Sequence, residues 1–126
     1  MFAGVGGGPI SPFGTPFEMT EDEIMNVLNQ SFEHCQSKTW MILVSHTPPK
    51  DTKLDVAFSG EHVGSSSLRK YIEGKRPAIA FCGHIHEARG IDHIGNTVIV
   101  NPGPARHRQC CLANISEKIE VNLDHL

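Results

Sequence analysis

Two short apolar runs, each followed by histidine, constrain the fold of this chain more than any other feature. The first, Ala78–Cys82, is bounded by Pro77 and leads into Gly83-His84-Ile85-His86. A short apolar run closed by strand-breaking residues indicates a buried strand. Gly83 permits a sharp turn, and two histidines at i and i+2 can point to the same side. We therefore expect a strand end that presents two imidazoles.

The second run, Trp40–Val44, continues into Ser45-His46-Thr47-Pro48-Pro49. The two prolines fix backbone angles just after His46 and so stiffen the turn that would carry it. In open α/β sheets, ligand sites collect outside the carboxyl ends of the strands. The sequence thus predicts an α/β fold in which His46, His84 and His86 meet at one edge of a sheet.

Length, composition and charge bound the class of protein. A chain of 126 residues with 39% hydrophobic and 20% charged residues is typical of one globular domain with a modest core. Its formal net charge of −3 gives no basic surface for nucleic acid. No apolar stretch reaches the roughly 18 residues needed to span a bilayer. We expect a cytoplasmic protein that binds neither nucleic acid nor membrane.

The four cysteines show no C-x-x-C pair and no regular spacing; they are Cys35, Cys82, Cys110 and Cys111. Reduced structural thiols are the favoured interpretation, which again fits the cytosol. One alternative is a small zinc module built from Cys82, His84, His86 and another cysteine. The ligand spacing fits no compact tetrahedral pattern, so this alternative is the weaker one.

Two helices are predicted from capping signals and apolar spacing. Thr20-Glu21-Asp22-Glu23 forms a capping box that should open a helix running to about Gln36. A serine-rich segment, Ser65–Ser67, should open a second helix that ends at Gly74. Serines at a helix start also suit an anion site, although ordinary capping is the favoured interpretation. The expected buried positions are Ile24, Val27, Leu28 and Phe32 in the first helix, and Leu68, Tyr71 and Ile72 in the second.

The remaining strands follow from apolar runs and turn residues. Met1–Val5 should be a strand followed by a glycine-rich loop. In this loop Gly4-x-Gly6 lacks the third glycine of a phosphate-binding motif. A hairpin is expected to turn near Gly95-Asn96. The further predicted strands are Thr97–Val100, Gln109–Ile115 and Lys118–Leu123.

Three segments together resemble a known family. Val44–Pro49, Cys82–Glu87 and Val100–Gly103, in this order and at this separation, are similar to the C-terminal half of the calcineurin-like metallophosphoesterases. The glycine-rich opening, Ser11–Glu18 and His62–Ser65 further resemble a mostly uncharacterised subgroup of small archaeal and bacterial members. The resemblance covers nearly the whole chain. It implies that residues 1–126 are the C-terminal portion of one domain, part of a two-sheet sandwich flanked by helices.

The resemblance also implies a function and a set of site residues. His46 and His84 would bind one ion of a dinuclear centre of manganese, iron, zinc or nickel, and His86 would bind the other. Such ions lower the pKa of a water from about 15.7 to about 7, and the resulting hydroxide attacks the phosphorus of a phosphoester. His62, Arg89 and Arg106 are candidates for contacting a small phosphoester substrate. Asn101–Gly103 would support the site structurally.

The sequence departs from the family in its N-terminal motifs. Asp-x-His, Gly-Asp and Gly-Asn-His, which supply the carboxylates, an asparagine ligand and the catalytic histidine, are absent, and Gly95-Asn96-Thr97 lacks the histidine. No catalytic residue is therefore assigned. We expect a fragment, a late start or a degenerate half-domain. The alternative to a hydrolase is a non-catalytic metal-binding or structural half-domain that needs a partner chain, and the sheet left uncovered predicts self-association.

Overall fold

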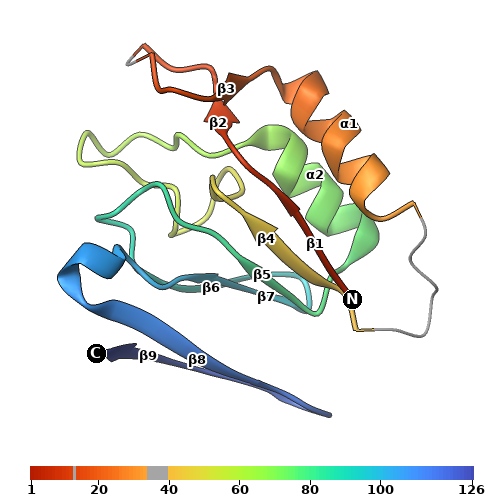
Figure 1. The fold of residues 1–126 in the computed structure, drawn as a ribbon, viewed down its shortest axis with the longest axis vertical. Helices are drawn as coiled ribbons and strands as arrows, with labels where there is room; N and C mark the ends of the chain where they lie inside the picture. Colours follow the sequence, from red (N-terminus) through yellow and green to blue (C-terminus); the bar gives the residue numbers. More distant parts are fainter. Residues whose placement is uncertain (13, 34–39) are drawn as a thin grey trace.

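A computed structural model describes residues 1–12, 14–33 and 40–126. Its centre is a five-stranded sheet with the order β1-β4-β5-β7-β6 (Figure 1). The strands are β1 (Phe2–Val5), β4 (Ile42–Ser45), β5 (Ile79–Phe81), β7 (Thr97–Asn101) and β6 (Gly90–Ile94). The first four run parallel and β6 runs antiparallel to β7. The predicted α/β fold is therefore confirmed, with β1, β4, β5 and β7 within two residues of their expected bounds.

The two faces of this sheet are covered differently. Helices α1 (Glu21–Ser31) and α2 (Ser66–Lys75) lie on one face, and a hairpin of β8 (Gln109–Ile115) and β9 (Ile119–His125) lies on the other (Figure 1). Two small elements complete the described fold: a parallel pair, β2 (Gly8–Pro9) with β3 (Glu18–Met19), and a 3₁₀ turn at Ala105–His107. A sheet packed on a second sheet, with helices outside, matches the expected portion of a two-sheet sandwich.

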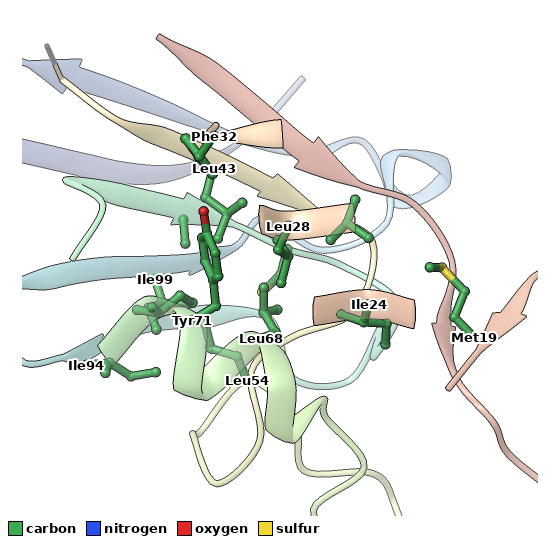
Figure 2. Close-up of a cluster of buried hydrophobic side chains, with 14 residues drawn as sticks. Met19, Ile24, Leu28, Phe32, Leu43, Leu54, Leu68, Tyr71, Ile94 and Ile99 are labelled. Atoms are coloured by element: carbon green, nitrogen blue, oxygen red, sulfur yellow. The ribbon is translucent and has the colours of Figure 1, made fainter. Parts of the chain in front are cut away.

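The main core lies between the helices and the sheet. Figure 2 shows this cluster, in which the labelled side chains are Met19, Ile24, Leu28, Phe32, Leu43, Leu54, Leu68, Tyr71, Ile94 and Ile99. The rings of Phe32 and Tyr71 stack with centroids 5.7 Å apart and so join the two helices. Burying a side chain of this size contributes about 1.5–3 kcal/mol. The predicted apolar stripes of both helices are confirmed, with Val27 partly buried.

A second, smaller core lies under the β8–β9 hairpin. Ile42, Ile79 and Val100 project from the central sheet and are buried there. Alternate hairpin residues pack on them, as the two-residue period of a strand requires. These hairpin residues are Cys111, Ala113, Ile115, Ile119, Val121 and Leu123.

The predicted helix starts are confirmed and the predicted ends are wrong. The Thr20 side chain accepts from the Glu23 amide at 3.2 Å, and Glu23 accepts from the Thr20 amide at 2.8 Å, which completes the capping box. Helix α1 ends at Ser31 because Phe32 leaves the helical conformation with φ −112° and ψ 8° and is buried beside Tyr71. The last part of the predicted helix, residues 34–36, lies outside the described residues.

Gly74 does not end α2. The helix continues to Lys75, and Arg76 closes it in the left-handed conformation with φ 52°. The reason is Pro77, which disfavours a right-handed helical conformation for the residue before it. Neither helix in the described ranges is long and apolar enough to cross a membrane.

Candidate metal centre at the carboxyl edge of the sheet

Backbone hydrogen bonds join the loops that follow three neighbouring parallel strands. The His46 amide donates to the Val5 carbonyl at 3.0 Å, and the Gly83 amide donates to the His46 carbonyl at 3.0 Å. These bonds extend the pairing of β1, β4 and β5 beyond the strand ends. As a result, His46 Nε2 and His84 Nδ1 lie 3.0 Å apart. Two of the three predicted metal ligands are therefore brought together at the predicted edge.

The residue with the turn conformation is His84, whereas the expected residue was Gly83. His84 has φ 65°, whereas Gly83 is not among the glycines with positive φ. A Cβ at Gly83 would lie 3.8 Å from the His46 carbonyl oxygen, an ordinary contact, so this position does not require glycine. A non-glycine residue in the left-handed region costs about 1–2 kcal/mol and is held there by its surroundings.

Asn101, at the end of β7, holds the segment that carries His84. Its Nδ2 donates to the Ile85 carbonyl at 2.8 Å and to the Ala88 carbonyl at 3.1 Å. Its Oδ1 accepts from the Gly103 amide at 3.0 Å. The side chain is buried, and all of these bonds are internal to the protein. This arrangement confirms the structural role expected for Asn101–Gly103.

His86 is not part of the histidine pair. Its Nδ1 lies 3.1 Å from Arg106 Nη2, on the 3₁₀ turn that follows β7. Within residues 1–12, 14–33 and 40–126, no three side chains of His, Cys, Asp or Glu are grouped closely enough to hold a metal ion. The structure thus separates the third predicted ligand from the first two and places a predicted substrate-binding arginine beside it.

The histidine pair fits two ligands of one ion. His46 Nε2 and His84 Nδ1 lie 3.0 Å apart, close enough that one ion could be held by both nitrogens. Burial, together with the neighbouring His46 and His86, lowers the pKa of His84 below its ordinary value. The neutral ring is the form that binds metal, and imidazole suits zinc, iron and nickel.

His62 is held by a buried carboxylate that sequence reasoning missed. His62 Nδ1 lies 2.7 Å from Asp55 Oδ1, and Asp55 is fully buried. Asp55 also accepts from the backbone amides of Asp51, Thr52 and Gly64 at 3.1, 2.9 and 3.1 Å. Burial raises the pKa of Asp55, but the hydrogen bonds outweigh it and hold this pKa below its ordinary value. The same hydrogen bond raises the pKa of His62.

Arg89, the third candidate for substrate binding, contacts backbone carbonyls. Its Nε donates to Pro102 at 3.0 Å, and its Nη2 donates to Asp124 at 3.0 Å. These bonds tie the histidine segment to the end of β9. Of the three predicted substrate residues, Arg106 is therefore the one that the structure places against a candidate metal ligand.

The zinc-module alternative does not fit the environment of Cys82. Burial, with the nearby Asp55 charge, raises the pKa of its thiol to about 12. The thiol also donates to the Val100 carbonyl at 3.5 Å. A zinc ligand must be a thiolate, so this site opposes ligation. Cys110 and Cys111 are free thiols as well, whereas Cys35 lies outside the described residues.

The serine-rich start of α2 is already satisfied within the protein. Ser65 caps the helix by accepting from the Leu68 amide at 3.0 Å. Glu21, at the start of α1, accepts from Ser65 Oγ, the Ser66 amide and the Ser67 amide at 2.8, 3.1 and 2.8 Å. The Glu21 carboxylate therefore occupies the position at the start of α2 where an external anion would bind. No local pattern identifies this pairing, because the partners are 44 to 46 residues apart.

Comparisons with known proteins agree with the motifs. A family model described as metallophosphoesterase of the calcineurin superfamily matches residues 24–126. The chain is 48% identical over 107 residues to the uncharacterised protein MJ1162 of Methanocaldococcus jannaschii, a match covering 82% of this chain and 48% of the relative. It is 40% identical over 60 residues to the UPF0046 protein K07C11.7 of Caenorhabditis elegans, covering 48% of this chain and 20% of the relative.

Solved structures show the same fold. One crystal structure matches 98% of this chain and 48% of its own length, with a TM-score of 0.72 and 21% identity. The crystal structure of TT1561 of Thermus thermophilus matches 98% of this chain and 53% of its own length, with a TM-score of 0.59 and 16% identity. The chain thus spans about half the length of MJ1162 and of these structures. Because the family model covers most of the sequence, the chain belongs to the calcineurin-like metallophosphoesterase superfamily.

Proposed function

We propose that this chain contributes to the site of a divalent-metal-dependent phosphoester hydrolase. The observation that carries the proposal is the 3.0 Å approach of His46 Nε2 to His84 Nδ1 at the carboxyl edge of the parallel strands. That edge is where α/β folds bind ligands. Superfamily membership supports phosphoesterase chemistry. The histidine pair supplies two imidazole nitrogens as ligands for the metal on which such chemistry depends.

In this proposal each described residue has a distinct task. His46 and His84 hold one ion, and Asn101 keeps the backbone around His84 in position. His86 is assigned to a second ion, which requires the Arg106 guanidinium to leave its Nδ1. The freed guanidinium suits an anionic phosphoryl oxygen, because its N–H groups pair well with phosphate. When bound, the ions supply Lewis acidity and a more acidic water.

A second candidate function follows from the incomplete ligand set. In the described part of the chain no carboxylate joins the histidine pair, although a two-metal site needs further ligands. A non-catalytic domain that binds metal, or only packs, and acts with a partner chain is consistent with this arrangement. We place either function in the cytoplasm, because the thiols of Cys82, Cys110 and Cys111 are unpaired, as is usual in reducing compartments.

Calorimetric titration with Mn²⁺ at pH 7.5 tests metal binding by the histidine pair. His46→Ala and His84→Asn should each weaken binding at least tenfold; asparagine is chosen because it tolerates the positive φ at position 84. His93→Ala is the matched control, since His93 is an exposed residue of β6. Affinity should also fall below about pH 6.5, because only the neutral imidazole binds metal.

Equal affinities for His46→Ala and His93→Ala would contradict metal binding at this site. If binding is lost as expected, hydrolysis of a simple phosphodiester by the Mn²⁺-loaded chain separates the two candidate functions. Turnover that disappears with His46→Ala supports the hydrolase. Tight binding without turnover supports the non-catalytic domain.

A further inference from the structure

Strand β1 forms one edge of the central sheet in the described part of the chain. It stands first in the strand order and pairs with β4 alone (Figure 1). The Ile42 amide donates to the Met1 carbonyl at 2.9 Å, which fixes the direction of the ladder. Backbone groups alternate in direction along a strand, so the N–H and C=O groups of Phe2 and Gly4 point to the free edge. In agreement, the Gly4 carbonyl accepts from Ser31 Oγ at 3.3 Å, which leaves its second lone pair for another donor.

Two exposed apolar side chains lie beside this edge, on the face of the sheet that carries the β8–β9 hairpin. Phe2 is in register with Ile42, whose side chain is buried under the hairpin, and Val44 follows Ile42 by two residues. The hairpin leaves Phe2 74% and Val44 46% exposed. Edge strands are normally protected by charged residues or proline, but β1 has neither, and no side chain before Glu18 is charged. The edge is therefore open to another strand.

Strand β1 is complementary to a second copy of itself. In an antiparallel pair centred on Ala3, Phe2 of one copy stands opposite Gly4 of the other, and the outward N–H and C=O groups of these residues bond to each other on both sides of the centre. A Cβ at Gly4 would lie 2.7 Å from the Val44 carbonyl oxygen and 3.6 Å from Val44 Cβ, so the position suits glycine and adjoins Val44. The Phe2 ring of one copy therefore has room to lie over Gly4 and against Val44 of the other. Aromatic side chains that cover strand glycines stabilise such pairs.

We propose that two copies of this chain associate through β1, as an antiparallel pair related by a two-fold axis perpendicular to the sheet. This symmetry keeps both hairpins on one face and covers Phe2 and Val44 of both copies. Because the contact uses the same free edge of each copy, assembly stops at two. The contact buries roughly 300 Å² per copy, less than the roughly 800 Å² of a standard interface, so the dimer is weak and depends on concentration.

Analytical ultracentrifugation from the micromolar to the millimolar range tests the dimer. Phe2→Lys places a charge at the edge, as protected edge strands do, and should weaken association at least about tenfold. Phe58→Lys is the matched control, because Phe58 is 91% exposed in a loop outside the sheet, and its association should stay within about twofold of the unmodified chain. Both replaced side chains are exposed, so melting temperatures in dilute solution should not change.

A mixture of two variants tests the register. Val44→Glu alone should weaken association, because the Phe2 ring of the other copy would cover a carboxylate. When Val44→Glu is mixed with Phe2→Lys, association should recover, since the lysine of one copy meets the glutamate of the other. The second contact in this mixed dimer keeps its original Phe2 and Val44. A mixture that associates no better than either variant alone would contradict the register.

Amide hydrogen exchange identifies the backbone groups that form the contact. Raising the protein concentration should slow exchange at Phe2 and Gly4, whose amides point to the free edge. The amides of Ala3 and Val5 point to β4 and should exchange at the same rate at every concentration. Protection that appears at another surface and not at Phe2 and Gly4 would assign the association elsewhere.

Three further outcomes would overturn the inference. They are a chain that stays monomeric into the millimolar range, association that Phe2→Lys leaves unchanged, and assemblies larger than two. The dimer does not depend on the proposed function, because the contact uses none of the candidate metal ligands. Mn²⁺ affinity should be the same for Phe2→Lys and the unmodified chain, so the metal site and the dimer succeed or fail in separate measurements.

Discussion

Two loops at the carboxyl edge, one carrying His84 and His86 and the other carrying His62, are each organised by one buried polar side chain, but the two side chains differ in charge. The histidine loop, residues 82–89, is held by the neutral amide of Asn101. The Asp55 loop, residues 49–65, is held by a carboxylate that accepts from three amides and from His62. Asn101 and Asp55 are 1% and 0% exposed, so burial alone does not distinguish them.

The two loops differ in whether the side chain that holds them titrates with pH. An amide does not titrate, so the bonds of Asn101 persist across the physiological pH range. Asp55 and His62 both titrate, which couples the shape of their loop to protonation. The edge therefore combines a loop held by an amide that does not titrate with a neighbouring loop held by a carboxylate and a histidine that do. Three substitutions, ordered by expected effect, test this contrast.

Asp55→Asn should have the largest effect. Each carboxylate oxygen accepts from at least one backbone amide, so the new NH₂ group must face an N–H donor in either orientation. We expect a loss of about 3 kcal/mol in the free energy of unfolding, measured by urea denaturation. Asp22→Asn, at an exposed position in the first turn of α1, should change it by less than about 1 kcal/mol. Similar losses for the two variants would show that Asp55 does not organise its loop.

Asn101→Ala should cost somewhat less, about 2 kcal/mol, because it leaves two carbonyls and one amide without their partner. It should also weaken Mn²⁺ binding, since Ile85 adjoins His84. Asn114→Ala, on the exposed side of β8, is the control for the loss of an asparagine. If Asn101→Ala lowered stability with unchanged Mn²⁺ affinity, the amide would support the fold without positioning the histidine.

His62→Gln should have the smallest effect, visible mainly as a change with pH. The pKa of His62 is raised, so the folded state binds the extra proton and its stabilising contribution is lost as pH rises through that pKa. The pKa of Asp55 is lowered, so its contribution is lost as pH falls through it. The contribution of the pair is complete between about pH 4 and about pH 6.5.

The measurement is the difference in melting temperature between the unmodified chain and His62→Gln from pH 5 to pH 9. Both proteins contain His84, whose lowered pKa makes stability fall as pH drops below about 6.5. Subtracting one melting temperature from the other removes this opposite dependence on pH. The difference should be largest at the acid end and shrink toward alkaline pH. A constant difference would show that the ion pair contributes nothing that depends on protonation.

Local signals predicted most of the fold. The capping box at Thr20–Glu23 formed as expected, because both partners lie within one helical turn. The hairpin at Gly95-Asn96 needed only a two-residue turn, and Gly95 takes the positive φ of 58° that such a turn requires. The strand ends also placed His46 and His84 at one edge, since neighbouring parallel strands deliver their following residues to the same place.

The errors arise where distant parts of the chain decide the outcome. His84 takes the left-handed conformation that Gly83 could have taken, within a segment held by Asn101 from 13 to 16 residues away. His86 lies beside Arg106, 20 residues further along the chain, a contact that no local pattern indicates; its role as a ligand of the second ion stays a prediction. Asp55 gave no recognisable motif, because its role depends on the loop folding around it. Periodicity and spacing describe neighbours in sequence and do not report such contacts.

The carboxylate of Glu21 at the start of α2 has a consequence for the approach of an anionic ester. Helix N-termini attract phosphate, but here an internal charge already compensates this one. The chain also carries a formal net charge of −3. Without bound cations, long-range electrostatics therefore repel a phosphoester, and added salt should speed the encounter by screening that repulsion. Cations at the histidine edge would reverse the sign of this salt dependence, making ionic strength a control on how fast substrate arrives.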